Sequence, residues 1–507
     1  MYSNIIYAIV IVLTGAIWWL IHLRGTTSAK PGHKALPGPL GLPIIGHLHL
    51  LGSLPHRSLY KLSQKYGPLM SLRLGFVPTV VVSSPAAAEL ILKTHDNIFA
   101  SRPEFQAGKY LSYGTKGMAF TKYNTYWRSL RKLASTELLS HAKINSMAGQ
   151  RREEIGLLVE SLRKAAVAGE VVDVSHKLGH LIEDMTCRML FGQSRDERFD
   201  LSHIIHEIAK LVGSFNIADF IPFLGPLDLQ GLTRRLKVVS EEVDKILETI
   251  IDDHEQDVSP GHKEADKDFV AVLLSLRNNP TSTHEHLSQA IERSHIKAIM
   301  LDLVFGAIDT SQTTIEWVMS ELLRHPRVMK LVQEEIENVV GNSEFLEESQ
   351  LSKLEYLDMV IKETLRLHPS GPLMLPHESM EDIVINGYYI PKKTRIIVNN
   401  WGLGRDPKVW SENVDEFYPD RFIGSNIDLR GKDFQLIPFG SGRRGCPGMH
   451  LGLLNVKLVV AQLVHSFNWE LPFGMKPNEL DMDETFALSL LRSTHLLAMP
   501  TSRGPQT

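Results

Sequence analysis

The chain has 507 residues, of which 43% are hydrophobic and 22% are charged, and its formal net charge is −4. This length exceeds the size at which a single hydrophobic core usually stops growing, so we expect two domains or one large domain with a buried cofactor. The ordinary composition and small net charge give no reason to expect binding to nucleic acid.

The N-terminal segment is predicted to span a membrane once. Residues 5–23 contain no Asp, Glu, Lys or Arg, and as an α-helix they would be about 28 Å long, close to the thickness of a hydrocarbon core. A cleaved signal peptide is the alternative, but no basic residue precedes the segment and 26–29 is a weak cleavage site. Because Arg24, Lys30 and Lys34 follow it, the rest of the chain is expected in the cytosol.

A proline-rich segment follows the predicted span. Residues 36–43 read Leu-Pro-Gly-Pro-Leu-Gly-Leu-Pro, and such prolines hold a chain extended and stiff. An ordinary linker would have the same geometry. Beyond residue 44 there is no repeat, low-complexity tract or second linker. We therefore expect a membrane anchor at 1–25, a basic and Pro-rich hinge at 26–45, and one globular domain at 46–507.

Most of this domain has helical periodicity. Short extended segments are expected at 69–74, 79–83 and 383–385, the last before an Asn-Gly turn signal. Examples of predicted helices are 144–166, 232–254 and 328–340. The predicted fold class is therefore mainly α with minor antiparallel β-sheets.

The sequence contains two cysteines, Cys187 and Cys446. So low a number favours a reducing compartment, because secreted proteins more often carry several disulfide-forming residues. Cys187 lies in 183–190, which is typical of a helix interior, so we expect an inert packing residue.

A long helix is predicted over 287–324, ended by Pro326. Its middle, 298–305, is apolar except for Asp302, which indicates burial. A glycine and the adjacent Asp309 and Thr310 then interrupt the apolar pattern. A threonine in a buried helix usually donates to a carbonyl of its own helix, and that structural role is one interpretation of Thr310.

The most informative segment is 438–448, which places four glycines around Cys446 and leads into an apolar helix at 449–464. Glycines allow a backbone to approach a flat ligand closely. The helix dipole and the neighbouring Arg443 and Arg444 are expected to favour a thiolate, which is what a haem iron requires for O–O cleavage. A turn with a buried free cysteine is the alternative.

At this point the chain resembles the cytochrome P450 superfamily, because every fixed position of that family's haem-binding signature is matched. The matching residues are Phe439, Gly442, Arg444, Cys446 and Gly448. The resemblance implies the cytochrome P450 fold around a buried haem b, preceded by a single N-terminal transmembrane helix. It also implies that Cys446 binds the iron, Arg444 pairs with a haem propionate and Phe439 shields the sulfur.

The resemblance extends to two other helices. It implies that Thr310 hydrogen-bonds to bound dioxygen and that Asp309 helps to relay protons. The family more often has glycine and threonine where Ala307 and Ile308 stand, which leaves the width of the oxygen groove open. Further propionate contacts are implied for Trp127 and Arg131, spaced i, i+4, and for His377.

Glu363 and Arg366 share one face of a predicted helix at i, i+3. Exposed pairs of this kind contribute little, but the flanking leucines indicate partial burial. By resemblance, Arg421 completes a buried structural network that holds the cysteine loop. Arg128 and Lys132 would remain available for a basic surface that attracts an acidic electron donor.

The order of motifs is closest to plant microsomal enzymes of specialised metabolism. The implied reaction is hydroxylation of a small lipophilic substrate, a terpenoid or a phenylpropanoid or biphenyl-type aromatic, by O₂ and NADPH. Electrons would come from NADPH–cytochrome P450 reductase at the endoplasmic reticulum membrane. A haem isomerase or dehydratase, and a non-enzymatic haem sensor or electron carrier, are the alternatives. The Asp309–Thr310 pair disfavours the isomerase and dehydratase, which need no proton relay.

By analogy with the family, the substrate pocket is expected to be apolar and aromatic, with Phe215, Phe220, Phe223 and Phe486 on its wall. The segments expected to line it are 102–120, 215–229, 301–310, 370–375 and 485–490.

Overall fold

The computed structural model describes residues 7, 10, 14 and 15 and residues 32–503, apart from 197–198, 200, 257–267, 279–290, 342 and 412. The predicted anchor at 1–25 and the hinge up to residue 31 fall almost entirely outside the described residues. Within the described part of the chain, no helix is both long and apolar enough to cross a membrane.

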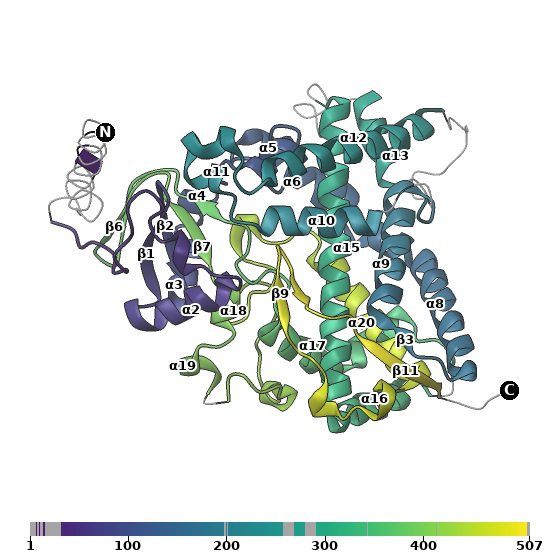
Figure 1. Ribbon diagram of the computed structural model, residues 1–507. Coiled ribbons are helices and arrows are strands. Elements are labelled where there is room, and N and C mark those ends of the chain that lie inside the picture. The colour runs from purple at the N-terminus through teal and green to yellow at the C-terminus, as the bar shows by residue number, and fades with distance from the viewer. Residues whose placement is uncertain are drawn as a thin grey trace.

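The described body is mainly helical, as predicted (Figure 1). Its longer helices are α2 (Pro55–Tyr66), α6 (Thr125–Leu133), α8 (Ala148–Ala168), α9 (Val174–Phe191), α10 (Leu201–Gly213), α12 (Leu232–Gln256), α13 (Phe269–Asn278), α15 (Arg293–Arg324), α16 (Pro326–Val340), α17 (Glu355–Leu367) and α20 (Met449–Ser466). The helices predicted at 144–166, 232–254 and 328–340 correspond to α8, α12 and α16.

Helix α15 runs through the middle of the helical part and packs against α9, α10, α17 and α20 (Figure 1). It begins at Arg293, because Glu292 caps its first turn, and ends at Arg324. Its end agrees with the sequence prediction, since the residue before Pro326 is disfavoured from continuing a helix. Cys187 on α9 is 2% exposed and belongs to the surrounding core, as expected.

The β-structure lies mostly to one side of the helices, nearest the N-terminus (Figure 1). A four-stranded sheet has the order β1 (Leu69–Leu74), β2 (Val77–Val82), β7 (Arg395–Val398) and β4 (His377–Glu378). The hairpin of β5 (Ile383–Ile385) and β6 (Tyr388–Ile390) turns at Asn386 and Gly387, both at positive φ, as the turn signal predicted.

Two small antiparallel sheets lie further along the chain. They are β3 (Val172–Asp173), β11 (Leu497–Ser502) and β8 (Phe467–Glu470), and the pair β9 (Glu484–Phe486) and β10 (Leu490–Arg492). The sheets are mainly antiparallel, as predicted, except that β2 and β7 run parallel with Thr79 opposite Arg395. The chain leaves the sheet after β2 and returns after the helical part, so no hairpin constrains their direction.

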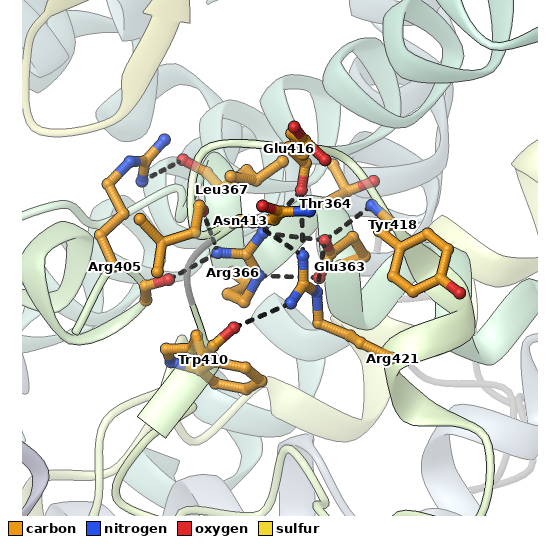
Figure 2. Close-up of polar contacts among 12 residues, drawn as sticks. Glu363, Thr364, Arg366, Leu367, Arg405, Trp410, Asn413, Glu416, Tyr418 and Arg421 are labelled. Atoms are coloured by element: carbon orange, nitrogen blue, oxygen red, sulfur yellow. Dashed lines mark hydrogen bonds and ion pairs between the residues drawn. The ribbon is translucent and has the colours of Figure 1, made fainter. Parts of the chain in front are cut away.

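A buried charge network fixes the segment that precedes the cysteine loop. Glu363 and Arg366 on α17 are both 0% exposed. The guanidinium of Arg366 donates to both carboxylate oxygens of Glu363 at 2.7 and 2.8 Å, and Nε of Arg421 donates to Oε1 at 2.8 Å. Figure 2 shows both guanidiniums directed at this one carboxylate.

The remaining donors of the network hold the backbone between Gly404 and Glu416. Arg366 donates to the carbonyls of Gly404 at 2.7 Å and Val414 at 2.6 Å, and Arg421 donates to the carbonyl of Trp410 at 3.1 Å (Figure 2). The structure therefore brings the three predicted charges together. Their hydrogen bonds go to this irregular segment, which leads to the cysteine loop, and not to the loop itself.

Replacing Glu363 by alanine should destabilise the protein by about 3–5 kcal/mol, because two guanidiniums then lose their carboxylate. The measurement is the midpoint of denaturant unfolding together with haem content. Glu334→Ala is the matched control, since the Lys330–Glu334 pair is exposed and 3.7 Å apart, and its loss should cost at most about 1 kcal/mol. Equal effects of the two substitutions would contradict the structural role of the network.

Candidate active site around Cys446

The cysteine loop is a tight turn that ends where α20 begins. The amide of Cys446 donates to the carbonyl of Phe439 at 2.8 Å, which closes the loop. Gly440 and Gly442 have φ of 69° and 67°, and a Cβ on Gly442 would lie 2.3 Å from the carbonyl oxygen of Leu92. Glycine is therefore required at Gly442 by both conformation and space.

The thiol of Cys446 lies on the wall of an internal cavity of about 350 Å³. Its sulfur is open to the cavity, although protein surrounds it closely. Burial raises the pKa of this thiol, while the backbone N–H of Gly448 and the charge of Arg131 act in the opposite direction. The expectation that Arg443 and Arg444 favour the thiolate is wrong, since Arg131 is the cation that acts on the sulfur.

Arg443 and Arg444 point away from the sulfur and fix the loop. Arg443 pairs with Asp96 at 2.8 Å. Arg444 donates to the carbonyls of Ala100 at 2.6 Å and Thr121 at 2.5 Å, and its guanidinium lies 4.2 Å from the ring centroid of Trp127. Burial and the nearby charge of Arg131 lower the pKa of Arg444 to about 9.

Helix α6 contributes Trp127 and Arg131 to the same wall. The side chain of Asn124 caps this helix by accepting from the amide of Trp127 at 2.8 Å. The indole N–H of Trp127 donates to the carbonyl of Met118 at 3.0 Å. The guanidinium of Arg131 makes no hydrogen bond or ion pair with another described residue, so its donors remain available to an anion in the cavity.

His377 also lines the cavity, but as a neutral ring. Its Nδ1–H donates to the carbonyl of Phe99 at 2.8 Å. Burial and the charges of Arg102 and Arg444 lower the pKa of His377 well below its ordinary value. Nε2 of His377 therefore carries a lone pair. A hydrogen bond from His377 to a propionate would require a second proton, on Nε2, and this contact stays a prediction.

Arg102 is a cavity-lining cation that the sequence analysis did not assign to the cofactor. It is buried and donates to the carbonyls of Leu375 at 2.6 Å and Pro376 at 2.9 Å. Together, Arg102, Arg131 and Arg444 surround one side of a cavity that has a thiol in its wall. This donor set fits a haem, whose iron takes a thiolate and whose two carboxylates favour guanidiniums.

The wall that includes Thr310 is formed by α15. Gly306, Ala307 and Thr310 line the cavity, and the Thr310 hydroxyl donates to the carbonyl of Gly306 at 2.7 Å. This is the structural bond that one interpretation of the sequence expected, and it leaves the hydroxyl lone pairs available as acceptors. Ile308 is 0% exposed within the core, so it does not narrow the groove.

Asp309 lies behind the cavity wall. Its carboxyl is 1% exposed and accepts a hydrogen bond from the hydroxyl of Ser489, a residue that does line the cavity. Its Oδ1 has no hydrogen-bond partner among the described residues, and burial raises the pKa of Asp309. Ser489 therefore connects Asp309 to the cavity through a hydrogen bond.

Asp302 is a second acidic residue at the site that the sequence analysis did not assign. It lines the cavity and accepts from the amides of Met118 and Ala119, the latter at 3.1 Å. Burial raises the pKa of Asp302 to about 6. This carboxylate connects the segment before α6 to α15. The one feature of the sequence that could have identified Asp302 is that it is the single acid in the apolar stretch 298–305.

The predicted pocket lining is correct for the segments that contain Arg102, Thr310, Ser370 and Ser489. It is wrong for 215–229, from which no residue reaches this cavity. Phe223 is 61% exposed, and Phe215, Phe220 and Phe486 line a separate, smaller cavity instead. The segment is displaced because Phe220 and Ile221 pack against β1 and β2 in their own hydrophobic cluster.

The chain belongs to the cytochrome P450 family, whose model matches residues 36–498. The family binds haem iron and acts on small molecules with O₂ and a redox partner. This chain is a cytochrome P450 monooxygenase of the plant group devoted to specialised metabolism.

Among its relatives, cytochrome P450 CYP736A12 of Panax ginseng is 60% identical over 498 residues, which cover 98% of this chain and 99% of that protein. Cytochrome P450 71A1 of Persea americana is 43% identical over 468 residues, covering 89% and 92% of the two chains. A solved zebra fish cytochrome P450, determined with progesterone, has a TM-score of 0.74 and 26% identity and covers 88% of this chain and 99% of its own.

Cys446→Ser should abolish the strongly red-shifted absorption of the reduced CO complex, because a hydroxyl cannot replace thiolate donation to the iron. The measurement is the reduced CO difference spectrum of the purified protein. Cys187→Ser is the control, since this buried thiol on α9 does not line the cavity, and it should retain the spectrum. Survival of the spectrum in Cys446→Ser would contradict the ligand assignment.

Proposed function

We propose that this monooxygenase hydroxylates a small lipophilic substrate with O₂ and electrons from NADPH. The observation that carries the proposal is that Cys446 and the Gly306–Thr310 turn of α15 line the same cavity. Apolar side chains, among them Phe120, Leu303 and Phe305, line the remainder. Terpenoids and phenylpropanoid or biphenyl-type aromatics both suit such a surface.

The proposed cofactor is haem b, with Cys446 as its iron ligand and Phe439 beside the sulfur. Arg131 and Arg444 would pair with the propionates, and Trp127 and His377 would complete the surrounding wall. With a thiolate ligand, haem supplies the O–O cleavage and the oxidation. The protein supplies ligation, orientation and proton delivery.

Proton delivery is assigned to Thr310 and Asp309. The Thr310 hydroxyl faces the cavity while its proton is directed at Gly306, so its oxygen can accept from a group bound beside it. Asp309 is placed to exchange a proton with the Ser489 hydroxyl. Thr310 and Asp309, both on α15, would thereby hold protons at the wall of the cavity.

The electron donor is proposed to be NADPH–cytochrome P450 reductase. Arg128 and Lys132 are exposed on α6, the helix whose other face brings Arg131 to the cavity. Neither cation makes an ion pair within the part of the chain that the structure describes. A basic surface so close to the cysteine side favours an acidic electron-transfer partner.

We also propose that residues 1–25 anchor the protein in the endoplasmic reticulum membrane, with the catalytic domain in the cytosol. An exposed apolar surface beside the hinge supports this. The amide of Gly75 donates to the carbonyl of Ile45 and the amide of Phe76 donates to the carbonyl of Phe220, so these bonds join the three segments that form the surface. The ring centroids of Phe76 and Phe223 lie 5.8 Å apart. Exposed apolar residues in this region are Leu40, Leu42, Ile44, Ile45, Phe76, Phe223, Leu227 and Leu229.

Thr310→Val should leave haem and substrate binding intact but divert reducing equivalents from product to peroxide. The change keeps the β-branched shape and removes the hydroxyl, so proton delivery is lost while packing is retained. The measurement is peroxide formed per NADPH consumed in the reductase-supported reaction.

Thr249→Val is the matched control, because the hydroxyl of Thr249 on α12 donates to the carbonyl four residues before it, at 2.9 Å, and Thr249 does not line the cavity. The control should change stability slightly and coupling not at all. Equal peroxide ratios in wild type and Thr310→Val would remove Thr310 from the catalytic residues.

Deleting residues 1–23 should yield a folded, haem-binding protein, because the segment contributes membrane affinity and not core packing. Sedimentation with lipid vesicles should fall without vanishing, since the exposed apolar surface remains. The measurement combines haem content with the vesicle-bound fraction. A truncated protein without haem would show that residues 1–23 belong to the globule.

A further inference from the structure

A second cavity, of about 80 Å³, lies beside the first and has no part in the proposed chemistry. Phe215, Phe220 and Phe486 contribute aromatic rings to its wall. Met374, Leu375 and Leu488 line both cavities, so the two are neighbours across a single layer of side chains. The second cavity has room for one end of a small molecule and not for a whole substrate.

A buried guanidinium without a partner lines this second cavity. Arg395, the first residue of β7, is 6% exposed and lies 4.7 Å from the ring centroid of Phe220. Its side chain makes no hydrogen bond or ion pair with another described residue, and its Nε is buried without a partner. Because an unpaired buried cation is strongly unfavourable, the arrangement is explained best by a ligand that accepts hydrogen bonds there.

A carboxylate from another element lies on the same wall. Oδ1 of Asp219, on α11 (Ile217–Phe220), accepts from the amide of Gln106 at 2.7 Å. Its other oxygen makes no hydrogen bond within the described chain. Asp219 and Arg395 attract each other without forming an ion pair. Burial raises the pKa of Asp219 to about 6, so it is mainly an ionised acceptor at neutral pH.

We propose that the second cavity binds a hydroxyl group at one end of the substrate, with Arg395 donating to the hydroxyl oxygen and Asp219 accepting its proton. This inference rests on the proposed function and narrows its substrate class to apolar molecules with an alcohol or phenol end. A carboxylate end is disfavoured by the charges of Asp219 and Glu378, both of which act on Arg395. An ammonium end is disfavoured by Arg395 itself.

The position of the cavity gives this contact a role in orientation. A molecule held by its hydroxyl at Arg395 and Asp219 would extend past Met374 toward the wall formed by Gly306 and Thr310. The side chain of Met374 is flexible and adapts to an extended ligand. The opposite end of the substrate would then be the end that reacts.

The test is isothermal titration calorimetry of the haem-loaded protein with four rigid probes that differ at one end. The probes are biphenyl, 4-hydroxybiphenyl, 4-methoxybiphenyl and biphenyl-4-carboxylate. The hydroxyl probe should bind the wild type about tenfold more tightly than each of the others, because they leave buried polar groups unsatisfied. Equal affinities for the hydroxyl and methoxy probes, or no measurable binding of the hydroxyl probe, would overturn the proposal.

Two variants assign the preference to its residues. Asp219→Asn keeps an oxygen for the amide of Gln106 but replaces the free acceptor by a donor, so the hydroxyl preference should fall to about twofold or less. Arg395→Met keeps the apolar stem and should lose the preference while retaining haem. Glu378→Gln is the control, since Glu378 does not line the cavity, and should keep the preference.

Each remaining outcome has a defined meaning. Persistence of the preference in Asp219→Asn, or its loss in Glu378→Gln, would contradict the assignment to the second cavity. Loss of haem from Arg395→Met would show that the folded protein needs the guanidinium, and this would contradict a guanidinium without a partner. Wild-type protein with the thiolate CO spectrum but no hydroxyl preference overturns this proposal alone, whereas absence of that spectrum overturns the proposed function.

Discussion

The structure depends above all on one buried carboxylate shared by two guanidiniums. Glu363, which is fully buried, binds Arg366 and Arg421, and the donors that remain on both arginines satisfy carbonyls of the irregular segment before the cysteine loop. Irregular backbone inside a protein must find such partners. The network thereby fixes the path of the chain toward Cys446, although it makes no hydrogen bond to the loop itself.

The functional side chains of the site come from elements that are far apart in the sequence. The loop before α20 presents the sulfur of Cys446, α6 brings Arg131 toward it, and α15 supplies the part of the wall that includes Thr310. Burial opposes the thiolate at Cys446, and Arg131 favours it. A bound metal would take the place that the proton holds in the thiol. In our proposal, the second cavity with its unpaired Arg395 orients the substrate and takes no part in the oxidation.

Local sequence patterns predicted the parts of the site whose geometry is itself local. The spacing of Glu363 and Arg366 specifies a contact within one turn of a helix, and the glycines before Cys446 specify the backbone conformation of their own loop. The roles of Asp302 and Arg395 were not predictable, because the residues that they contact lie more than 170 positions away along the chain. The same reason explains the parallel pairing of β2 with β7 and the displacement of 215–229 from the main cavity.

The central claim is that this chain inserts one atom of O₂ into a lipophilic substrate. The most direct measurement is mass spectrometry of the product formed under ¹⁸O₂, in ordinary water, with the protein, NADPH and reductase. The account predicts a product heavier than the substrate by one ¹⁸O atom, with the second labelled atom in water. A product whose added oxygen is unlabelled, or one with no added oxygen, would contradict it.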